Sequence, residues 1–334
     1  MEKRFEEVMR EDIMGADISE SEKQKLLNNL LLMKEQKINL LITGATGCGK
    51  SSTINALFKA DVAKVGVGVD PETMDITKYE MDNLVLWDSP GLGDGREADN
   101  RHAKNIISKL NERDANGNLL IDLVLVILDG STRDLGTSYE LINQVIIPNL
   151  GDEKEKRILV AINQADVAMK GRYWNYVENK PEPQLERFLD EKVESVRKRI
   201  KEGTGLSVDP IYYSAGFKEE DGEQSPPYNL AKLLYYIVQY TPKKKRLVYV
   251  QNINNNKSMW KDNDTLKDYK KEITKDFTES IFDGVIKGSD IGRNIGGIFG
   301  GPFEEIGAVV GGLAGGAIEI VKAGANFLGS IFGF

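Results

Sequence analysis

One octapeptide determines what kind of domain this chain forms: Gly44-Ala45-Thr46-Gly47-Cys48-Gly49-Lys50-Ser51. It fits the pattern G-x-x-x-x-G-K-[ST], follows the apolar run Ile38 to Ile42 and precedes a predicted helix at residues 52–58. This order is typical of a phosphate-binding loop between a strand and a helix, because glycines let the backbone wrap closely around phosphate oxygens. The sequence therefore predicts a nucleotide-binding α/β domain.

The roles of the loop residues follow from phosphate chemistry. Backbone N–H groups of the loop and of the helix N-terminus point at the anion. Lys50 neutralises β- and γ-phosphate charge and is a predicted catalytic residue, while Ser51 ligates Mg²⁺. Nearby N–H groups could lower the thiol pKa of Cys48, although a small space-filling role is favoured. The predicted nucleotide-binding residues here are Gly44, Ala45, Thr46, Gly47, Cys48, Gly49, Lys50, Ser51 and Ser52.

Composition limits the class of protein. Of 334 residues, 40% are hydrophobic and 29% charged, the balance of a soluble globular protein of about two units. The net charge of −8 disfavours a large basic face for nucleic acid, although Lys243 to Arg246 form a compact basic run. A single cysteine and a single histidine exclude a disulfide and paired-ligand metal sites. The charged start, Met1 to Glu7, does not resemble a secretory signal, so we expect a cytoplasmic protein.

The apolar pattern predicts a doubly wound, mostly parallel sheet. Helical patterns alternate with apolar runs at residues 38–42, 84–87, 123–128, 158–162 and 211–213. Residues 1–36 are predicted to be helical, with a capping box formed by Ser19 and Glu22. A polar stretch, residues 252–271, is predicted to be a loop or linker leading into a helix. The expected divisions are an N-terminal helical segment at 1–36, a nucleotide-binding domain at 37–242, a linker and helix at 243–283, and a glycine-rich segment at 284–334.

A second motif, Asp88-Ser89-Pro90-Gly91, follows the apolar run Leu84 to Trp87. At the carboxyl end of a strand, Asp88 can hold Mg²⁺ through water while the Gly91 N–H meets the γ-phosphate. D-x-x-G alone is often only a turn. Its place after the phosphate loop favours the catalytic interpretation of Gly91.

A third motif, Asn163-Gln164-Ala165-Asp166, closes another apolar run. The Asp166 carboxylate can accept two hydrogen bonds from guanine N1–H and N2–H₂, which adenine does not offer. Asn163 would tie this loop to the phosphate loop, and the stem of Gln164 could lie against the base. After the last run, Ser214-Ala215 would offer the Ala215 N–H to guanine O6, although a plain loop is a serious alternative.

The order and spacing of these motifs resemble those of translation-factor-class (TRAFAC) small GTPases over residues 37–242. The likeness is closest to Era-like GTPases of the bacterial YfjP/YeeP type, through Val69-Asp70-Pro71-Glu72-Thr73-Met74-Asp75-Ile76 and the N-Q-A-D motif. Glu72-Thr73-Met74 is more distantly similar to immunity-related GTPases. The resemblance implies a GTPase with GTP or GDP and Mg²⁺ as cofactors. It also implies that Thr73 closes over Mg²⁺ and the γ-phosphate, with Thr77 as the alternative.

Two positions depart from the pattern. The usual lysine of N-K-x-D is Gln164, which puts part of the affinity for the base in doubt. The water-orienting glutamine that follows D-x-x-G in Ras-like proteins is Leu92, so slow intrinsic hydrolysis is expected. A missing catalytic group could come from a partner or a second copy. Within the chain, the nearby candidates are Asp94, Arg96, Arg101 and His102, for each of which solvated surface charge is the favoured interpretation.

The last 51 residues are a separate kind of segment, since they hold 15 of the 33 glycines. Glycines recur every four residues from Gly284 to Gly300 and again from Gly307 to Gly315, with a break at Gly301-Pro302. Such rows let helices approach closely, as in glycine zippers. Three interpretations stay open, namely membrane insertion or association, a soluble helical hairpin, and disorder.

We therefore expect a GTP-hydrolysing switch that controls self-association and tail-mediated membrane contact, in bacterial defence or membrane remodelling. The alternatives are an Era-like ribosome or RNA accessory GTPase and a regulatory GTP-binding module with negligible hydrolysis. The expected partners are a guanine nucleotide, further copies of the chain and a membrane contacted through residues 284–334, with nucleic acid or ribosome less favoured. A cytoplasmic location, including the inner face of the membrane, fits this view.

Overall fold

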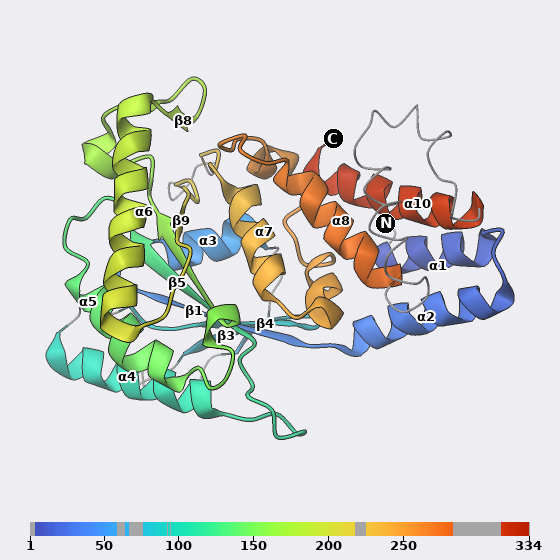
Figure 1. The fold of residues 1–334 in the computed structure, drawn as a ribbon, viewed down its shortest axis with the longest axis horizontal. Coiled ribbons are helices and arrows are strands. Elements are labelled where there is room, and N and C mark those ends of the chain that lie inside the picture. The colour runs from blue at the N-terminus through green and yellow to red at the C-terminus, as the bar shows by residue number, and fades with distance from the viewer. Residues whose placement is uncertain are drawn as a thin grey trace.

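The structure is a computed structural model that describes residues 4–58, 64–66, 76–91, 93, 95–217, 225–282 and 315–333 (Figure 1). Its centre is a seven-stranded sheet with the order β2-β3-β4-β1-β5-β6-β9. The strands are β1 (Ile38–Gly44), β2 (Lys64–Gly66), β3 (Thr77–Met81), β4 (Leu84–Asp88), β5 (Leu123–Asp129), β6 (Ile158–Asn163) and β9 (Ile211–Tyr212). All neighbours from β4 to β9 pair in parallel, whereas β2 and β3 continue the sheet antiparallel. The predicted mostly parallel sheet is confirmed.

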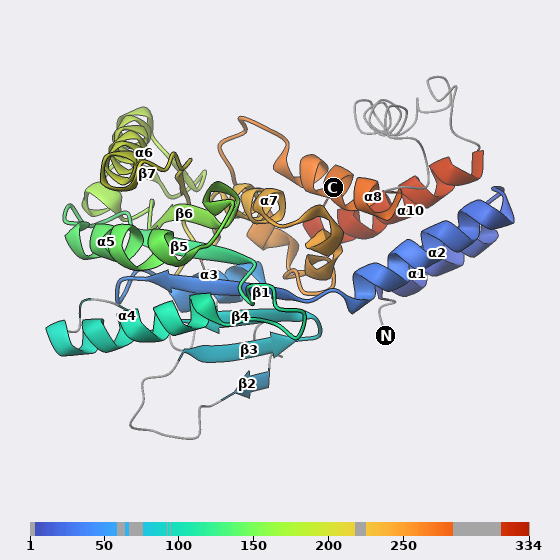
Figure 2. The same ribbon diagram turned by 60° about the horizontal axis from the view of Figure 1, so that its bottom comes forward.

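Helices cover both faces of this sheet (Figure 2). They are α3 (Lys50–Leu57), α4 (Arg96–Asn111), α5 (Gly136–Glu140) continued by η2 (Leu141–Ile146) and η3 (Ile147–Asn149), α6 (Pro183–Thr204) and α7 (Leu230–Tyr240). Short η4 (Lys154–Lys156), η5 (Ala168–Gly171) and the hairpin β7 (Trp174–Asn175) and β8 (Lys180–Pro181) lie in the connections. Alternate strand residues serve opposite faces, as the period of a strand requires. In β5, Leu125 belongs to the core shared with α3 and α7, and Val126 belongs to the core shared with α4, η2 and α6.

A set of helices from both ends of the sequence packs beside the sheet, and we call this set the helical layer (Figures 1 and 2). It comprises α1 (Phe5–Gly15), α2 (Glu20–Glu35), η6 (Lys243–Tyr249), η7 (Lys257–Trp260), α8 (Tyr269–Phe282) and α10 (Gly315–Phe332). The predicted capping box begins α2, since Ser19 Oγ accepts from the Glu22 N–H at 3.3 Å and the Glu22 carboxylate accepts from the Ser19 N–H at 3.0 Å. The helical prediction for the N-terminal segment is thus confirmed for residues 5–15 and 20–35.

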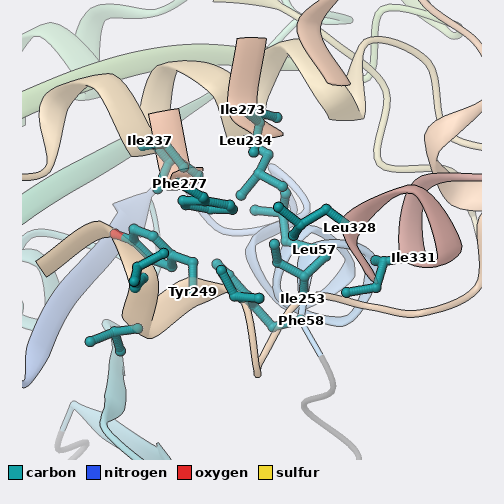
Figure 3. Close-up of a cluster of buried hydrophobic side chains, with 14 of the residues drawn as sticks. Leu57, Phe58, Leu234, Ile237, Tyr249, Ile253, Ile273, Phe277, Leu328 and Ile331 are labelled. Atoms are coloured by element: carbon teal, nitrogen blue, oxygen red, sulfur yellow. The ribbon is translucent and has the colours of Figure 1, made fainter. Parts of the chain in front are cut away.

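The stretch predicted to be a loop or linker leading into a helix, residues 252–271, is irregular apart from η7 and leads into α8, and it also contributes side chains to the hydrophobic core. Ile253 and Trp260 are fully buried, and the Trp260 indole N–H donates to the Asn254 carbonyl at 2.8 Å. Figure 3 shows Ile253 in one cluster with Phe58, which follows α3, and with Phe277 of α8 and Leu328 of α10. The prediction of an irregular segment agrees with the structure, but its burial was not predicted, because a few large apolar side chains spaced among asparagines and lysines are enough to anchor such a segment.

The glycine rows fall mostly outside the described residues, which exclude 283–314. The end of the tail is described and forms α10, which packs against α1 and α8. Phe327 lies with its ring centroid 5.2 Å from that of Phe5, and Phe332 lies 5.4 Å from Trp260. Among the described residues, no helix has both the length and the apolar character needed to cross a membrane.

Candidate nucleotide-binding site

The predicted motifs converge at one edge of the sheet. Strands β4, β1, β5 and β6 are parallel neighbours, and their carboxyl ends are Asp88, Gly44, Asp129 and Asn163. In open α/β sheets this edge is where ligands bind, because the loops that leave it surround a crevice. Four loops therefore lie together at this edge of the sheet: the loop between β1 and α3 and those after β4, β6 and β9.

The loop between β1 and α3 has the backbone of a phosphate-binding loop. Gly49 has φ +87°, and a Cβ there would collide with the side chain of Asn163, so this position requires glycine. Helix α3 begins directly at Lys50, so its first free N–H groups face the loop. The Lys50 ammonium donates to the Gly44 and Ala45 carbonyls at 3.3 and 3.1 Å. The nucleotide phosphates, which are the predicted partners of Lys50, would compete with these two carbonyls for its ammonium group.

A buried hydrogen bond fixes α3 to the sheet. Thr53 Oγ donates to the Gly49 carbonyl at 2.8 Å and lies 2.7 Å from the Tyr213 hydroxyl. Both side chains are fully buried. The first turn of α3 is thereby held against the segment that follows β9, one hundred and sixty residues later.

Cys48 is a buried space-filling residue. It is fully buried under the loop, and burial raises the pKa of its thiol to about 11 despite the nearby Lys50 ammonium. The alternative of a lowered thiol pKa is wrong, because removal from water disfavours the thiolate more than the local positive charge favours it. The favoured space-filling interpretation agrees with this burial.

Asp88 has the properties expected of a cation-binding carboxylate. Its Oδ1 is buried and has no hydrogen-bond partner within the described part of the chain. Burial raises the pKa of the carboxyl to about 6, while Lys50 opposes the rise. An orphaned, desolvated oxygen of this kind fits Mg²⁺, which prefers carboxylate and hydroxyl oxygens. Ser51, the other predicted ligand, lies in the first turn of α3 and is exposed.

The backbone after Asp88 is tied to the phosphate loop on one side and to α4 on the other. Ser89 Oγ donates to Thr43 Oγ at 2.8 Å, next to the start of the loop. Gly91 lies so close to Thr46 that a Cβ on Gly91 would collide with the Thr46 backbone. The Gly91 carbonyl lies 3.0 Å from His102 Nδ1. The D-x-x-G glycine therefore sits directly against the phosphate loop.

The predicted tie between Asn163 and the phosphate loop is present. The Asn163 amide donates to the Cys48 carbonyl at 2.9 Å, and its oxygen accepts from the Ala215 N–H at 2.9 Å. Gln164, which replaces the usual lysine, donates from its side-chain amide to the Gly47 carbonyl at 2.7 Å. A neutral donor thus joins the loop after β6 to the phosphate loop, at the position where the N-K-x-D motif has a lysine.

The remaining base-site residues lie beside this junction. Asp166 is half-buried in the turn that follows Gln164, and its carboxylate makes no hydrogen bond or ion pair to the residues that the structure describes. The Ala215 N–H, predicted to meet guanine O6, donates to Asn163, so O6 would have to compete for it. Ser214 Oγ accepts from the Gly216 N–H at 3.2 Å and shapes the same turn.

The structure describes only some of the residues predicted to surround the γ-phosphate. Thr73, Leu92 and Asp94 lie outside the described residues. Thr77, the alternative to Thr73, begins β3 and is paired with Asp88 across the antiparallel ladder. Arg96 and Arg101 are exposed on α4, as favoured. His102 is fully buried, so its interpretation as solvated surface was wrong.

Two hydrogen bonds next to the site were not predicted from the sequence. Neither the Thr53–Tyr213 bond nor the His102–Gly91 bond belongs to a known spacing. A signal for the second existed, because His102, Ile106 and Leu110 recur at four-residue intervals and predict the buried face of α4.

A strand, a glycine loop and a helix, with D-x-x-G after β4 and N-Q-A-D after β6 at the same edge of the parallel sheet, define the fold of a P-loop GTPase domain. Residues 39–164 match the family model described as "50S ribosome-binding GTPase". This part of the chain is a GTP-binding GTPase domain. The family hydrolyses GTP.

Curated relatives cover the same region. Protein YkfA of Escherichia coli K12 is 27% identical over 157 residues, which is 46% of this chain and 50% of YkfA. Protein YfjP of the same strain is 30% identical over 131 residues, 38% of this chain and 41% of YfjP. The chain spans about half the length of the curated relatives it matches. Among solved structures, Toc33 from Arabidopsis thaliana with GDP and Mg²⁺ is 17% identical, with a TM-score of 0.40 over 74% of this chain and 98% of that chain.

Proposed function

We propose that this chain is a GTP-hydrolysing switch whose nucleotide state is sensed by the helical layer. The observation that carries the guanine assignment is the Asn163 junction. One side chain joins the phosphate loop, through the Cys48 carbonyl, to the Ala215 turn. This supports a base site next to the phosphate site, with Asp166 three residues after Asn163. A base bound at Asp166 and a phosphate bound at the loop would then belong to one ligand.

The phosphate end of the site supports Mg²⁺-dependent chemistry. Lys50 would bind the β- and γ-phosphates, Ser51 and Asp88 would hold Mg²⁺, and Thr73 would complete the cation site in the GTP state. Mg²⁺ would supply charge neutralisation for phosphoryl transfer. The Gly91 N–H would meet the γ-phosphate. Loss of this phosphate on hydrolysis would then be sensed by the backbone of the D-x-x-G motif.

Asp166 gives the sharpest test of the guanine assignment. Wild-type protein should bind GTP and GDP and should bind ATP at least about a hundredfold more weakly, since adenine lacks the donor pair. Asp166→Asn should lose affinity for GDP and gain affinity for xanthosine diphosphate, because xanthine has an acceptor where guanine has its N2 donors. Titrations with labelled nucleotides measure both. Equal binding of ATP by the wild type, or an unchanged guanine preference in the variant, would refute the assignment.

Slow hydrolysis and self-association form the second part of the proposal. Leu92 has no group that can orient water, so a group from another copy would complete the site. Specific activity should then rise with protein concentration, and the GTP-bound protein should form a dimer or larger assembly. Hydrolysis that is fast and independent of concentration would contradict this part and would indicate a complete site in one copy.

The helical layer is connected to the phosphate-loop helix, which supports its role as the responding element. The Asn254 N–H donates to the Leu57 carbonyl at 2.9 Å, at the end of α3. The ring of Phe58 stacks on Tyr249 with centroids 6.1 Å apart. A shift of α3 on nucleotide exchange would therefore act directly on η6 and its neighbours. Membrane contact through residues 284–334 would be the output of this change.

A ribosome or RNA accessory role is the second candidate, favoured by the description of the matching family. The basic run offers it little support, because Lys245 is paired with Asp122 at 2.6 Å and Arg246 with Asp276 at 3.0 Å. Cosedimentation with liposomes and with ribosomes, each in GTP and in GDP, separates the two. Binding to ribosomes alone would favour the accessory role, and GTP-dependent binding to liposomes alone would favour the membrane switch.

A further inference from the structure

The one histidine of the chain lies in an unusual setting. His102 is fully buried on α4, in its second turn, and its Nδ1 lies 3.0 Å from the Gly91 carbonyl. A carbonyl oxygen can only accept, so Nδ1 must carry the proton of this hydrogen bond. Nε2 is also buried and has no partner among the described residues. Among the described residues, Gly91 is thus the one polar partner of a ring that is otherwise buried.

Gly91 is held from two sides. On one side its backbone lies against Thr46 of the phosphate loop, with no room for a Cβ. On the other side His102 binds its carbonyl, and because the peptide unit is planar this fixes the ψ torsion of Gly91. Two residues on, the Gly93 N–H donates to the Asp99 carboxylate at 2.8 Å. Gly91 and Gly93 are therefore both attached to the first two turns of α4.

We propose that His102 is a positioning residue for GTP hydrolysis, which acts by fixing the backbone of Gly91. The inference rests on the proposed function of Gly91 as the residue whose N–H meets the γ-phosphate. With its carbonyl bound to His102 and its Cα held against Thr46, Gly91 has little freedom to turn its N–H away from the γ-phosphate, and any displacement of Gly91 by the γ-phosphate must move His102 and with it α4. The His102 ring would therefore restrain Gly91 during hydrolysis and would also connect the bound nucleotide to α4.

A purely packing role makes a different prediction. If the ring only fills space, any side chain of similar volume should serve, and the position of the donor should not matter. If the bond matters, the donor must stand where Nδ1 stands. An asparagine amide nitrogen is three bonds from Cα, as Nδ1 is, whereas a glutamine amide is one bond further out, near the place of Nε2.

The kinetic test compares His102→Asn, His102→Gln and His102→Leu with the wild type in single-turnover GTP hydrolysis and in GDP binding. GDP affinity should stay within about twofold in all three, since GDP does not reach Gly91. Hydrolysis should fall about five- to tenfold in the Gln and Leu variants, the range of one hydrogen bond, and should return to within about threefold in the Asn variant. Equal rates in Asn and Gln variants of equal melting temperature would overturn the proposal.

A second test does not depend on activity. Because the chain has one histidine, ¹⁵N-histidine labelling gives signals from His102 alone. At mildly alkaline pH the spectrum should show the tautomer with the proton on Nδ1, and the signal should differ between the GDP complex and the complex with a non-hydrolysable GTP analogue. A proton on Nε2 in both complexes would overturn the proposal. Failure of the wild type to bind guanine nucleotides would instead show that the proposed function, and not the role of His102, had failed first.

Discussion

The side-chain amide of Asn163 donates to the Cys48 carbonyl over 2.9 Å, so the loop predicted to read the base is bonded to the middle of the phosphate loop. The two residues are 115 positions apart in sequence. Both partners are buried, which makes this contact costly to lose.

Asn163→Ala is expected to damage stability and nucleotide binding together. It removes one hydrogen bond from the buried Cys48 carbonyl and one from the Ala215 N–H, at about 1–3 kcal/mol for each bond. Thermal unfolding with and without GDP should show a lower midpoint and a smaller shift on adding GDP. Gln164→Ala, which removes one bond from a half-exposed side chain, is the matched control and should have the smaller effect. The reverse order of the two variants would show that the junction does not depend on Asn163.

Asp88 should make the stability of the metal-free protein depend on pH. Its pKa in the folded protein is about 6, above the ordinary value of 3.8, so the folded state holds the proton more tightly than the unfolded chain. The resulting stability is fully present below about pH 4 and is lost as the pH rises through about 6. Denaturant unfolding at about pH 5 and about pH 7.5 should show this loss in the wild type and a weaker one in Asp88→Asn.

Mg²⁺ with GDP should offset this loss of folding stability in the wild type above about pH 6, because a bound cation favours the ionised carboxylate of Asp88. Asp152→Asn, an exposed carboxylate away from the site, is the control and should behave as the wild type. If Asp88→Asn keeps the full pH dependence and the full response to Mg²⁺, Asp88 is not the cation-binding group.

The Thr53–Tyr213 bond should be measurable by a double-mutant cycle. Tyr213→Phe, Thr53→Val and the double variant should show a coupling of about 0.5–1.5 kcal/mol in the free energy of unfolding, because the hydroxyl groups are buried and 2.7 Å apart. Tyr176→Phe, in an exposed side chain of the hairpin connection, should change nothing. Strictly additive single variants would mean that the bond does not hold α3 to the sheet.

The helical layer should be essential to the fold. Leu328→Ala in α10 should lower the free energy of unfolding by about 2–5 kcal/mol, since Leu328 is fully buried in the cluster of Figure 3. Asn326→Ala, on the exposed side of the same helix, should stay within about 0.5 kcal/mol of the wild type. A chain cut after Phe282 should aggregate, because it exposes the apolar surface that α10 covers. A soluble, GDP-binding truncated protein with the wild-type melting temperature would show that α10 is dispensable.

The sheet and the nucleotide motifs could be predicted because each depends on a local pattern. Apolar runs such as Leu123 to Leu128 are bounded by turn residues, and the phosphate loop has a fixed spacing. The helical layer could not be predicted as a unit. The apolar face of α10 indicates burial, but nothing in it indicates that Phe327 packs on Phe5. The same holds for His102, whose partner is a backbone carbonyl and leaves no trace in side-chain chemistry.

The contact between α1 and α10 has a consequence for how the molecule is made. Phe5 leaves the ribosome early, yet the ring that covers it is Phe327, which is translated more than three hundred residues later. Contacts so distant in sequence form slowly, because a long loop must close before they stabilise anything. The sheet and its phosphate loop can therefore assemble while α1 and α2 still expose their apolar faces to solvent. During synthesis, chaperones would be expected to bind α1 and α2 until α10 has been made.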